Sequence, residues 1–150
     1  VAVMFEGEIV QIGTPKDLFE KPAHTFVGHF IGSPGMNLLP CSLEDGHPVF
    51  SGNKINISSP LPPVKRDSRL EIGIRPEFIK IDKTGFPIKI HRIDDVGRYR
   101  VVKAECNGSS FNVYVPESQE IPSDNVRISF DPQYTHVYCD GWLHKNQEDS

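Results

Sequence analysis

The sequence has few cysteines and no long apolar run. Its three cysteines, Cys41, Cys106 and Cys139, are odd in number and far apart in a chain of 150 residues. This spacing excludes CxxC redox and zinc motifs and makes a disulfide framework unexpected. No apolar stretch approaches the roughly 20 residues that cross a bilayer, and residues 1–10 lack the basic start of a signal peptide. We therefore expect a reducing, cytosolic compartment.

The motifs of common enzyme classes are also missing. The sequence has no GxxxxGK[ST] phosphate loop and no GxGxxG, HExxH or GxSxG motif. His24 and His29 are five residues apart, which places them on different faces of a helix rather than around a metal ion. Asp94 and Asp95 are neighbours in an extended segment, so their side chains diverge and favour turn formation over acid–base catalysis. We expect no catalytic residue, no metal site and no bound cofactor in this chain.

Basic charge is not in excess either. The 16 Lys and Arg residues against 20 Asp and Glu residues give a net charge of −4, which does not favour nucleic-acid binding. What is abundant is glycine and proline, with 12 and 13 residues, and this favours short elements joined by turns over a helical bundle. At roughly 100–200 residues per domain, the length predicts one domain, or one domain with a tail.

The N-terminal segment has its own pattern. Residues 1–5 read as a buried strand, Glu6-Gly7 as a turn, and residues 8–12 as the returning strand. Because this pattern starts inside a strand, we expect the chain to be a piece of a longer protein. Thr14 and Asp17 then have the spacing of a capping box around Pro15, which predicts a helix start.

A second helix is predicted from Ala23 to Ile31, with Phe26, Val27, Phe30 and Ile31 on one stripe. Gly32-Ser33-Pro34-Gly35 ends it and is the best domain boundary in the chain. We expect three parts: residues 1–32, a β-rich domain at residues 33–143, and a polar, frayed tail at residues 144–150.

Beyond the boundary the apolar period becomes two. Half-buried strands are predicted at residues 70–74, 86–90 and 126–130. The strongest turn is Asn107-Gly108, because both residues tolerate positive φ in a two-residue hairpin. It pairs Cys106 with Ser109, Ala104 with Phe111, Val102 with Val113, and Arg100 with Val115. Asp45-Gly46 is a weaker hairpin signal, and residues 58–63 read as an extended loop or edge.

Two polar groups are distinctive. Arg75 and Glu77 flank Pro76, which would suit a rigid ion pair or a contact to another surface, and a satisfied pair at a strand end is the plainer alternative. The second group is Tyr99 with its basic neighbours, a combination that an oligonucleotide-binding barrel uses, although a solvated strand face explains it as well; those neighbours are Arg98, Arg100 and Lys103.

Taken in order, the residues resemble a known family. The run Gly7–Pro15, followed by Leu18-Phe19, Pro22, Phe26-Val27, Phe30–Pro34 and Met36-Asn37, is similar to the end of the ATPase domain of maltose/glycerol-3-phosphate-type ABC importers, at its junction with the C-terminal domain. Gly73–Glu77 resembles the Arg-Pro-Glu segment of that domain. Residues 126–132, 136–138 and 140–141 resemble its closing strands. The likeness runs from residue 1 to about residue 143.

The resemblance implies a mainly β fold: an OB-like β-barrel, or TOBE domain, preceded by a short βαα remnant of the nucleotide-binding domain. The parent protein would be an ABC-type ATPase that uses ATP and Mg²⁺. Its implied partners are its own nucleotide-binding domain, a second ATPase subunit and membrane permease subunits, on the cytoplasmic face of the cell membrane. The phosphate loop, signature motif and switch histidine of the family lie upstream of residues like these, so no catalytic residue carries over.

We therefore expect a non-catalytic regulatory or dimerisation domain of an importer for sugars, polyols or sugar phosphates. Arg75, Pro76, Glu77 and Asp131 are the expected interface residues. Apolar residues of the first segment, such as Phe5 and Phe30, would lose their partners, so the segment should pair with another copy or dock onto its own barrel. The alternative function is direct binding of a sugar, an anion or an oligonucleotide, in a pocket of Arg98, Tyr99 and Arg100.

Overall fold

A computed structural model describes residues 1–32 and 35–146. Its N-terminal unit contains an antiparallel hairpin of β1 (Ala2–Phe5) and β2 (Glu8–Ile12), followed by helices α1 (Pro15–Glu20) and α2 (Thr25–Phe30). The capping box is confirmed, because Thr14 accepts from the Asp17 amide and Asp17 accepts from the Thr14 amide. The hairpin is confirmed too, but not its burial. Met4, in the strand predicted to be buried, is 58% exposed, and Ile12, in the returning strand, is 71% exposed.

The second helix is shorter than predicted. His24 precedes it as the N-cap, and its Nδ1 accepts from the Phe26 amide at 3.0 Å, so Ala23 and His24 lie outside the helix. The residues of the predicted apolar stripe differ in burial: Val27 is fully buried, whereas Phe30 is 65% exposed. Residues 33 and 34 of the predicted boundary lie outside the described residues, as do residues 147–150 of the predicted tail.

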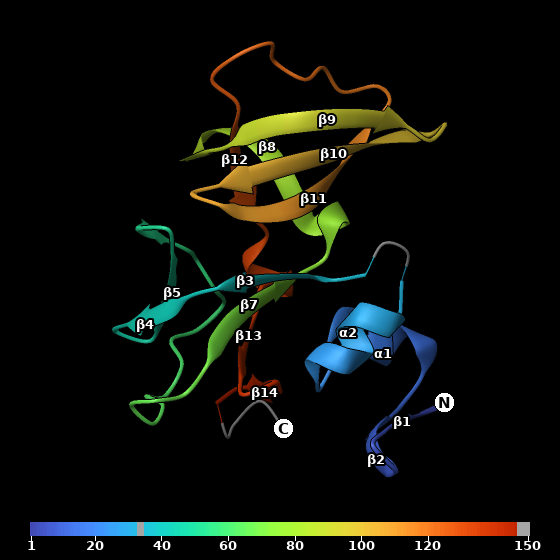
Figure 1. Ribbon diagram of the computed structural model, residues 1–150, viewed down its shortest axis with the longest axis vertical. Coiled ribbons are helices and arrows are strands. Elements are labelled where there is room, and N and C mark those ends of the chain that lie inside the picture. Colours follow the sequence, from blue (N-terminus) through green and yellow to red (C-terminus); the bar gives the residue numbers. More distant parts are fainter. Residues whose placement is uncertain (33–34, 147–150) are drawn as a thin grey trace.

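The β region forms two stacked parts (Figure 1). One four-stranded sheet has the order β14-β13-β7-β3. A small sheet β4-β5-β6 lies beside it, and the Asp45-Gly46 turn between β4 and β5 is confirmed by positive φ at both residues. The strands of these two sheets are β3 (Asn37–Pro40), β4 (Ser42–Glu44), β5 (His47–Phe50), β6 (Asn53–Lys54), β7 (Leu70–Ile74), β13 (His136–Cys139) and β14 (Trp142–His144).

The second part lies at the top of Figure 1 and combines the sheets β11-β10-β9 and β12-β8. Its strands are β8 (Ile79–Pro87), β9 (Lys89–Asp95), β10 (Tyr99–Cys106), β11 (Ser109–Pro116) and β12 (Arg127–Phe130). All four predicted pairs across the Asn107-Gly108 turn are confirmed in the β10–β11 register. The predicted strand at residues 86–90 is wrong as one element: β8 ends at Pro87, which has no N–H to donate, and β9 begins at Lys89.

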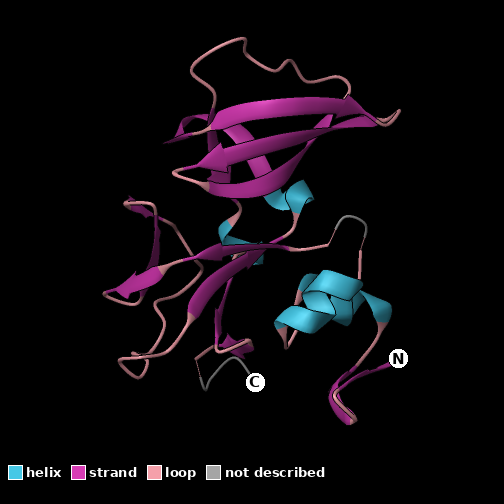
Figure 2. Ribbon diagram, in the orientation of Figure 1, coloured by secondary structure: helices cyan, strands magenta, loops and turns pink. Residues whose placement is uncertain are grey.

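Short 3₁₀ turns at Pro76–Phe78 and Pro132–Tyr134 join the two β parts. One apolar cluster runs through both and includes Leu39, Phe50, Ile72, Phe111 and Ile128. The expected fold class is confirmed: the chain is mainly β, with a small helical part preceding the β region (Figure 2). Within the described residues, no helix has the length and apolar character needed to cross a membrane.

Candidate functional site

Arg75 lies where the N-terminal helices meet the four-stranded sheet. It follows the last residue of β7 and precedes Pro76, and only 3% of it is exposed. Its Nε donates to the Phe19 carbonyl oxygen at 2.7 Å, and its Nη1 donates to the carbonyl oxygens of Gly28 and Ile31. The guanidinium carbon lies 4.1 Å from the centre of the Phe19 ring. One side chain at the end of β7 therefore holds both helices.

The chemistry of this contact follows from the ends of short helices. The last carbonyls of α1 and α2 have no partner within their own helix, and they carry partial negative charge that favours a cation. Arg75 donates to carbonyl oxygens at both ends, and among the described residues it forms no salt bridge with a carboxylate. Burial lowers the pKa of its guanidinium, while nearby Glu77 opposes that shift. Nη2 has no hydrogen-bond partner among the described residues.

Strand β13 makes two further polar contacts to the helical unit. The Tyr138 hydroxyl donates to the Pro22 carbonyl oxygen at 2.7 Å, and its burial raises the pKa of the phenol. His136 Nε2 lies 2.8 Å from the Glu20 carbonyl oxygen. Because a carbonyl only accepts, this Nε2 carries the proton. Burial also lowers the pKa of His136, so its imidazole stays neutral more readily than in water.

The backbone completes the attachment. The Thr25 amide donates to the Gly141 carbonyl oxygen, and the Leu143 amide donates to the Ala23 carbonyl oxygen, each at 2.9 Å. The ring of His24 meets the edge of Trp142 at a centroid distance of 4.7 Å. The expectation that the N-terminal segment docks onto its own barrel therefore agrees with these contacts. We name this set of contacts, from residues 19–31 to β7, β13 and β14, the junction.

Close backbone packing supports the junction from within. A Cβ atom at Gly73 would lie 2.5 Å from Tyr138 Cε2, and one at Gly28 would lie 2.3 Å from Met36 Cε. Real Cβ atoms do not approach other atoms so closely. These two glycines therefore let Met36 lie between helix α2 and strand β7.

The four predicted interface residues do not form one cluster. Arg75 faces the helices, and Pro76 is buried beside it. Glu77 is exposed and lines a different cavity, with Tyr99 and Tyr114. The rigid Arg75–Glu77 ion pair is absent among the described ion pairs. Asp131 caps the second 3₁₀ turn by accepting from the Gln133 amide at 3.0 Å. Their assignment to an interface stays a prediction.

The sequence did not identify Tyr138 and His136 as site residues. Both stand in a short strand whose apolar and polar residues look ordinary, and their acceptors lie 116 residues earlier in the chain. No local pattern reports such a contact, because the acceptors are backbone carbonyls that any residue supplies. Only the fold places them at the junction.

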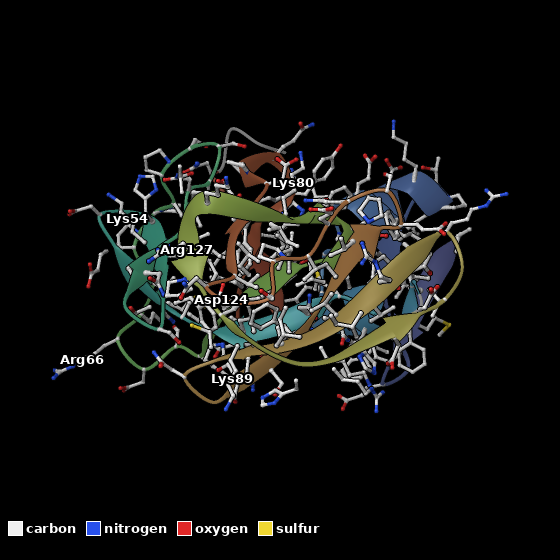
Figure 3. The ribbon with its side chains drawn as sticks, turned by 90° about the horizontal axis from the view of Figure 1, so that it is seen from above. Lys54, Arg66, Lys80, Lys89, Asp124 and Arg127 are labelled. Carbon is white, nitrogen blue, oxygen red and sulfur yellow. The ribbon has the colours of Figure 1, made fainter. Side chains whose placement is uncertain are left out.

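The basic and aromatic group around Tyr99 is only partly assembled. The rings of Tyr99 and Tyr114 lie 4.5 Å apart beside a cavity of about 390 Å³. Neither Arg98 nor Arg100 lines that cavity, and Arg100 instead donates to the carbonyl oxygens of Pro116 and Gln119. Among the basic side chains labelled in Figure 3, Arg66 and Lys89 point outward at separate places around the β region. The cavity beside Tyr99 therefore lacks the two arginines of the predicted pocket.

Asp94 and Asp95 make local contacts, in agreement with their interpretation as turn-forming residues. The Asp95 carboxylate accepts from the Gly97 amide at 2.9 Å, and Asp94 pairs with Arg92 at 3.0 Å. The described residues contain no group of three His, Cys, Asp or Glu side chains able to hold a metal ion. Cys41, Cys106 and Cys139 are free thiols.

Part of the sequence matches the model of a known domain family. Residues 32–79 match the family model described as the MalK OB fold domain. The chain is therefore similar to the OB-fold domain of the MalK type, and this stretch includes Arg75 and strand β7.

Curated relatives extend the likeness along the chain. A sn-glycerol-3-phosphate import ATP-binding protein UgpC of Bordetella avium is 39% identical over 130 residues, which are 85% of this chain and 36% of the relative. UgpC 2 of Agrobacterium fabrum is 29% identical over 143 residues, 92% of this chain and 38% of the relative. UgpC of Vibrio vulnificus is 32% identical over 146 residues, 92% of this chain and 39% of the relative. The chain thus spans less than two fifths of the length of these relatives.

These matches confirm the resemblance predicted from the sequence, to the C-terminal domain of a carbohydrate ABC importer ATPase. They support a component of an ABC importer ATPase as the class of protein to which this chain corresponds.

Proposed function

We propose that this chain is a non-catalytic regulatory and dimerisation domain of the ATP-binding subunit of an ABC importer. The cargo of the importer is a sugar, a polyol or a sugar phosphate, and glycerol-3-phosphate is the first candidate because it stands in the names of the relatives. The observation that carries the proposal is the buried Arg75, which ties two helices to the central strand β7 by three carbonyl contacts.

The exposed apolar residues of the N-terminal unit support a partner on its other side. Five apolar residues of the unit are more than half exposed: Val1, Met4, Ile9, Ile12 and Phe30. On the face toward the sheet, backbone carbonyls of the unit instead accept hydrogen bonds from Arg75, His136 and Tyr138. Large apolar groups left in water each forgo about 1.5–3 kcal/mol. Under the proposal, the nucleotide-binding domain of the same subunit covers them. ATP and Mg²⁺ bind in that domain, outside the described chain.

The junction then acts as a mechanical connection. Movement of the helices reaches β7 through Arg75 and β13 through Tyr138, because both side chains hold backbone atoms rather than flexible side chains. Under the proposal, the β region holds a second ATPase subunit and receives regulatory signals, while permease subunits contact the ATPase domains. The assembly lies on the cytoplasmic face of the cell membrane.

The test compares two variants of the full-length subunit assembled with its permease in proteoliposomes. Arg75→Gln keeps a polar side chain of similar reach but removes the charge and the fork of donors. Arg66→Gln makes the same change at an outward-pointing position labelled in Figure 3. We expect Arg75→Gln to lower the ratio of glycerol-3-phosphate transported to ATP hydrolysed severalfold and to weaken subunit dimerisation in ultracentrifugation. Arg66→Gln should change neither.

Equal transport ratios and equal dimerisation in the two variants would overturn the regulatory role. Competition by unlabelled sugars, polyols and sugar phosphates in the same vesicles identifies the cargo class. That second measurement is independent of Arg75, so an error about the cargo is distinguishable from an error about regulation.

A further inference from the structure

The cavity beside Tyr99, of about 390 Å³, lies between the open end of the β10–β11 hairpin and the start of β8, in the upper part of Figure 1. Its volume falls in the range of roughly 300–1,000 Å³ that is usual for small-molecule sites. One wall is aromatic and comes from Tyr99 and Tyr114, and another is aliphatic and comes from Ile79, Ile81 and Val115. Walls of this kind are typical of a site that takes a small molecule out of water.

The register of the hairpin places the two tyrosines next to each other. Tyr99 pairs with Pro116, and Val101 pairs with Tyr114, so the tyrosines are diagonal neighbours on one face of the β10–β11 pair. Their ring centres lie 4.5 Å apart and their planes are inclined at 33°. Together the rings form one broad aromatic surface along the cavity. Because the face of an aromatic ring is electron-rich, it attracts the polarised C–H groups of a sugar ring that lies against it.

Polar side chains of both hydrogen-bonding kinds line the same cavity. Glu77 brings a carboxylate that accepts, Lys80 brings an ammonium group that donates, and Gln119 brings an amide that does both. These three residues are exposed, whereas Ile79 and Val115 are buried. The polar groups therefore lie at the mouth of the cavity and the apolar groups at its base. Opposite charges at one mouth suit a neutral ligand with several hydroxyl groups better than they suit an anion.

The aromatic surface and the carboxylate belong to one site. Burial raises the pKa of Tyr114 to about 12, and a hydrogen bond with Tyr99 and the charge of Glu77 act in the same direction. The phenol of Tyr114 therefore keeps its proton at neutral pH. The Glu77 carboxylate is also close enough to influence that proton, so a ligand lying on the tyrosine rings is within reach of it.

We propose that this cavity binds the ring of a neutral sugar. Under the proposal, one face of the ring lies on Tyr99 and Tyr114, and the hydroxyl groups bond to Glu77, Lys80 and Gln119. A sugar ring needs an apolar surface for its C–H groups and a mixture of donors and acceptors for its hydroxyls, and the cavity supplies both. Binding needs only this chain, so the proposal goes beyond the role in transport, and either of the two can fail without the other.

The experiment is calorimetric titration of the 150-residue chain with glucose and with maltose, a one-ring and a two-ring sugar. Glycerol-3-phosphate and leucine are the comparison probes, because the first is an anion without a ring and the second carries both charges without hydroxyl groups. We expect heat of binding with at least one sugar and none with the comparison probes. Heat with glycerol-3-phosphate or leucine alone, or no heat with any probe, overturns the proposal.

Two variants locate the site. Tyr99→Leu removes an aromatic ring but keeps an apolar side chain, and Glu77→Gln keeps a polar side chain but removes the charge. We expect each variant to weaken sugar binding about tenfold. Glu44→Gln is the matched control, because it makes the same change as Glu77→Gln on β4, in the other part of the β region. The control should leave sugar binding unchanged.

Hydrogen exchange gives the second readout. Sugar should slow amide exchange at residues 77–81 and 114–119, which form the walls of the cavity, and Glu77→Gln should reduce that slowing at the same sugar concentration. Circular dichroism of the variants checks that the β region is retained. Sugar binding that neither Tyr99→Leu nor Glu77→Gln weakens, or slowing confined to other parts of the chain, places the sugar elsewhere and overturns the proposal.

Discussion

The N-terminal unit and the β region of this chain are stabilised in opposite ways. The β region surrounds a continuous apolar cluster, in which Leu39, Phe50, Ile72 and Ile128 are almost fully buried. The N-terminal unit buries Leu18 and Val27 but exposes Met4, Ile12 and Phe30. It is held by polar contacts from Arg75, Tyr138 and His136 to its backbone carbonyls. One region depends on apolar area, and the other depends on a few directed bonds.

This difference predicts two kinds of failure. Loss of a core side chain weakens every element that packs on the cluster, so the whole β region should unfold as a unit. Loss of a directed bond at the junction should free the helices while the β region persists, because local opening follows local contacts. Four measurements test this contrast.

The largest effect is expected from Phe50→Ala. Phe50 is fully buried, and its ring packs on Phe86 and Phe111 at centroid distances of 6.0 and 6.4 Å. The substitution should lower the free energy of unfolding by about 3–5 kcal/mol, as measured by urea denaturation followed by circular dichroism. Phe50→Leu is the control and should lose less. If the substitution accelerated amide hydrogen exchange only in the N-terminal helices, the β region would not depend on a single apolar core.

The next effect is expected from Arg75→Gln. Removing the guanidinium leaves carbonyl groups of α1 and α2 without their buried donor, which should weaken docking of the helices by about 3 kcal/mol. Hydrogen exchange should speed up at residues 15–31 and stay slow in β10 and β11. Uniform acceleration across the chain would show that the junction and the core unfold together, contrary to the comparison.

A smaller effect is expected from acid. Burial is the main cause that lowers the pKa of His24 and of His136 below the ordinary value of 6.5. The unfolded chain therefore binds more protons near that pH than the folded chain does. The stability that the neutral histidines contribute to docking is fully present above pH 6.5 and decreases as the pH falls from there through their lowered folded-state pKa. His24 also needs an unprotonated Nδ1 to accept from the Phe26 amide.

Hydrogen exchange at residues 15–31, measured on either side of pH 6.5, checks this prediction. His136→Gln keeps a donor for the Glu20 carbonyl without a titrating group, so it should flatten part of the pH dependence. If exchange in the wild-type chain did not depend on pH, protonation of these histidines would not control docking of the helices.

The smallest effect is expected from Ile12→Asn. Ile12 is among the most exposed apolar residues, and substitutions at such positions usually change stability by less than about 0.5 kcal/mol. The 150-residue chain should therefore unfold at the same urea concentration as the wild type. In the full-length subunit the same variant should be destabilising, if the proposed nucleotide-binding domain covers this face. Loss of stability in the short chain itself would show that Ile12 already has a partner there.

The sequence correctly predicted the features that depend only on neighbouring residues. The Asn107-Gly108 hairpin has its predicted register because turn geometry and apolar alternation agree there. The capping box of Thr14 and Asp17 is a three-residue motif that needs no distant partner. By contrast, the break between β8 and β9 depends on how Pro87 meets the neighbouring strand. The burial of Arg75 depends on carbonyls 44 to 56 residues away, and no sequence pattern specifies those.

The contact between His24 and Trp142 gives the junction an optical label. Trp142 is the single tryptophan of the chain, and its ring lies edge-on to the imidazole of His24 at an interplanar angle of 82°. Tryptophan emission responds to solvent and to a nearby imidazole, while the rest of the β region contributes no indole signal. The intensity and wavelength of that emission therefore follow the attachment of the helices in an unmodified protein. The chain carries its own fluorescent reporter at the place where its two regions meet.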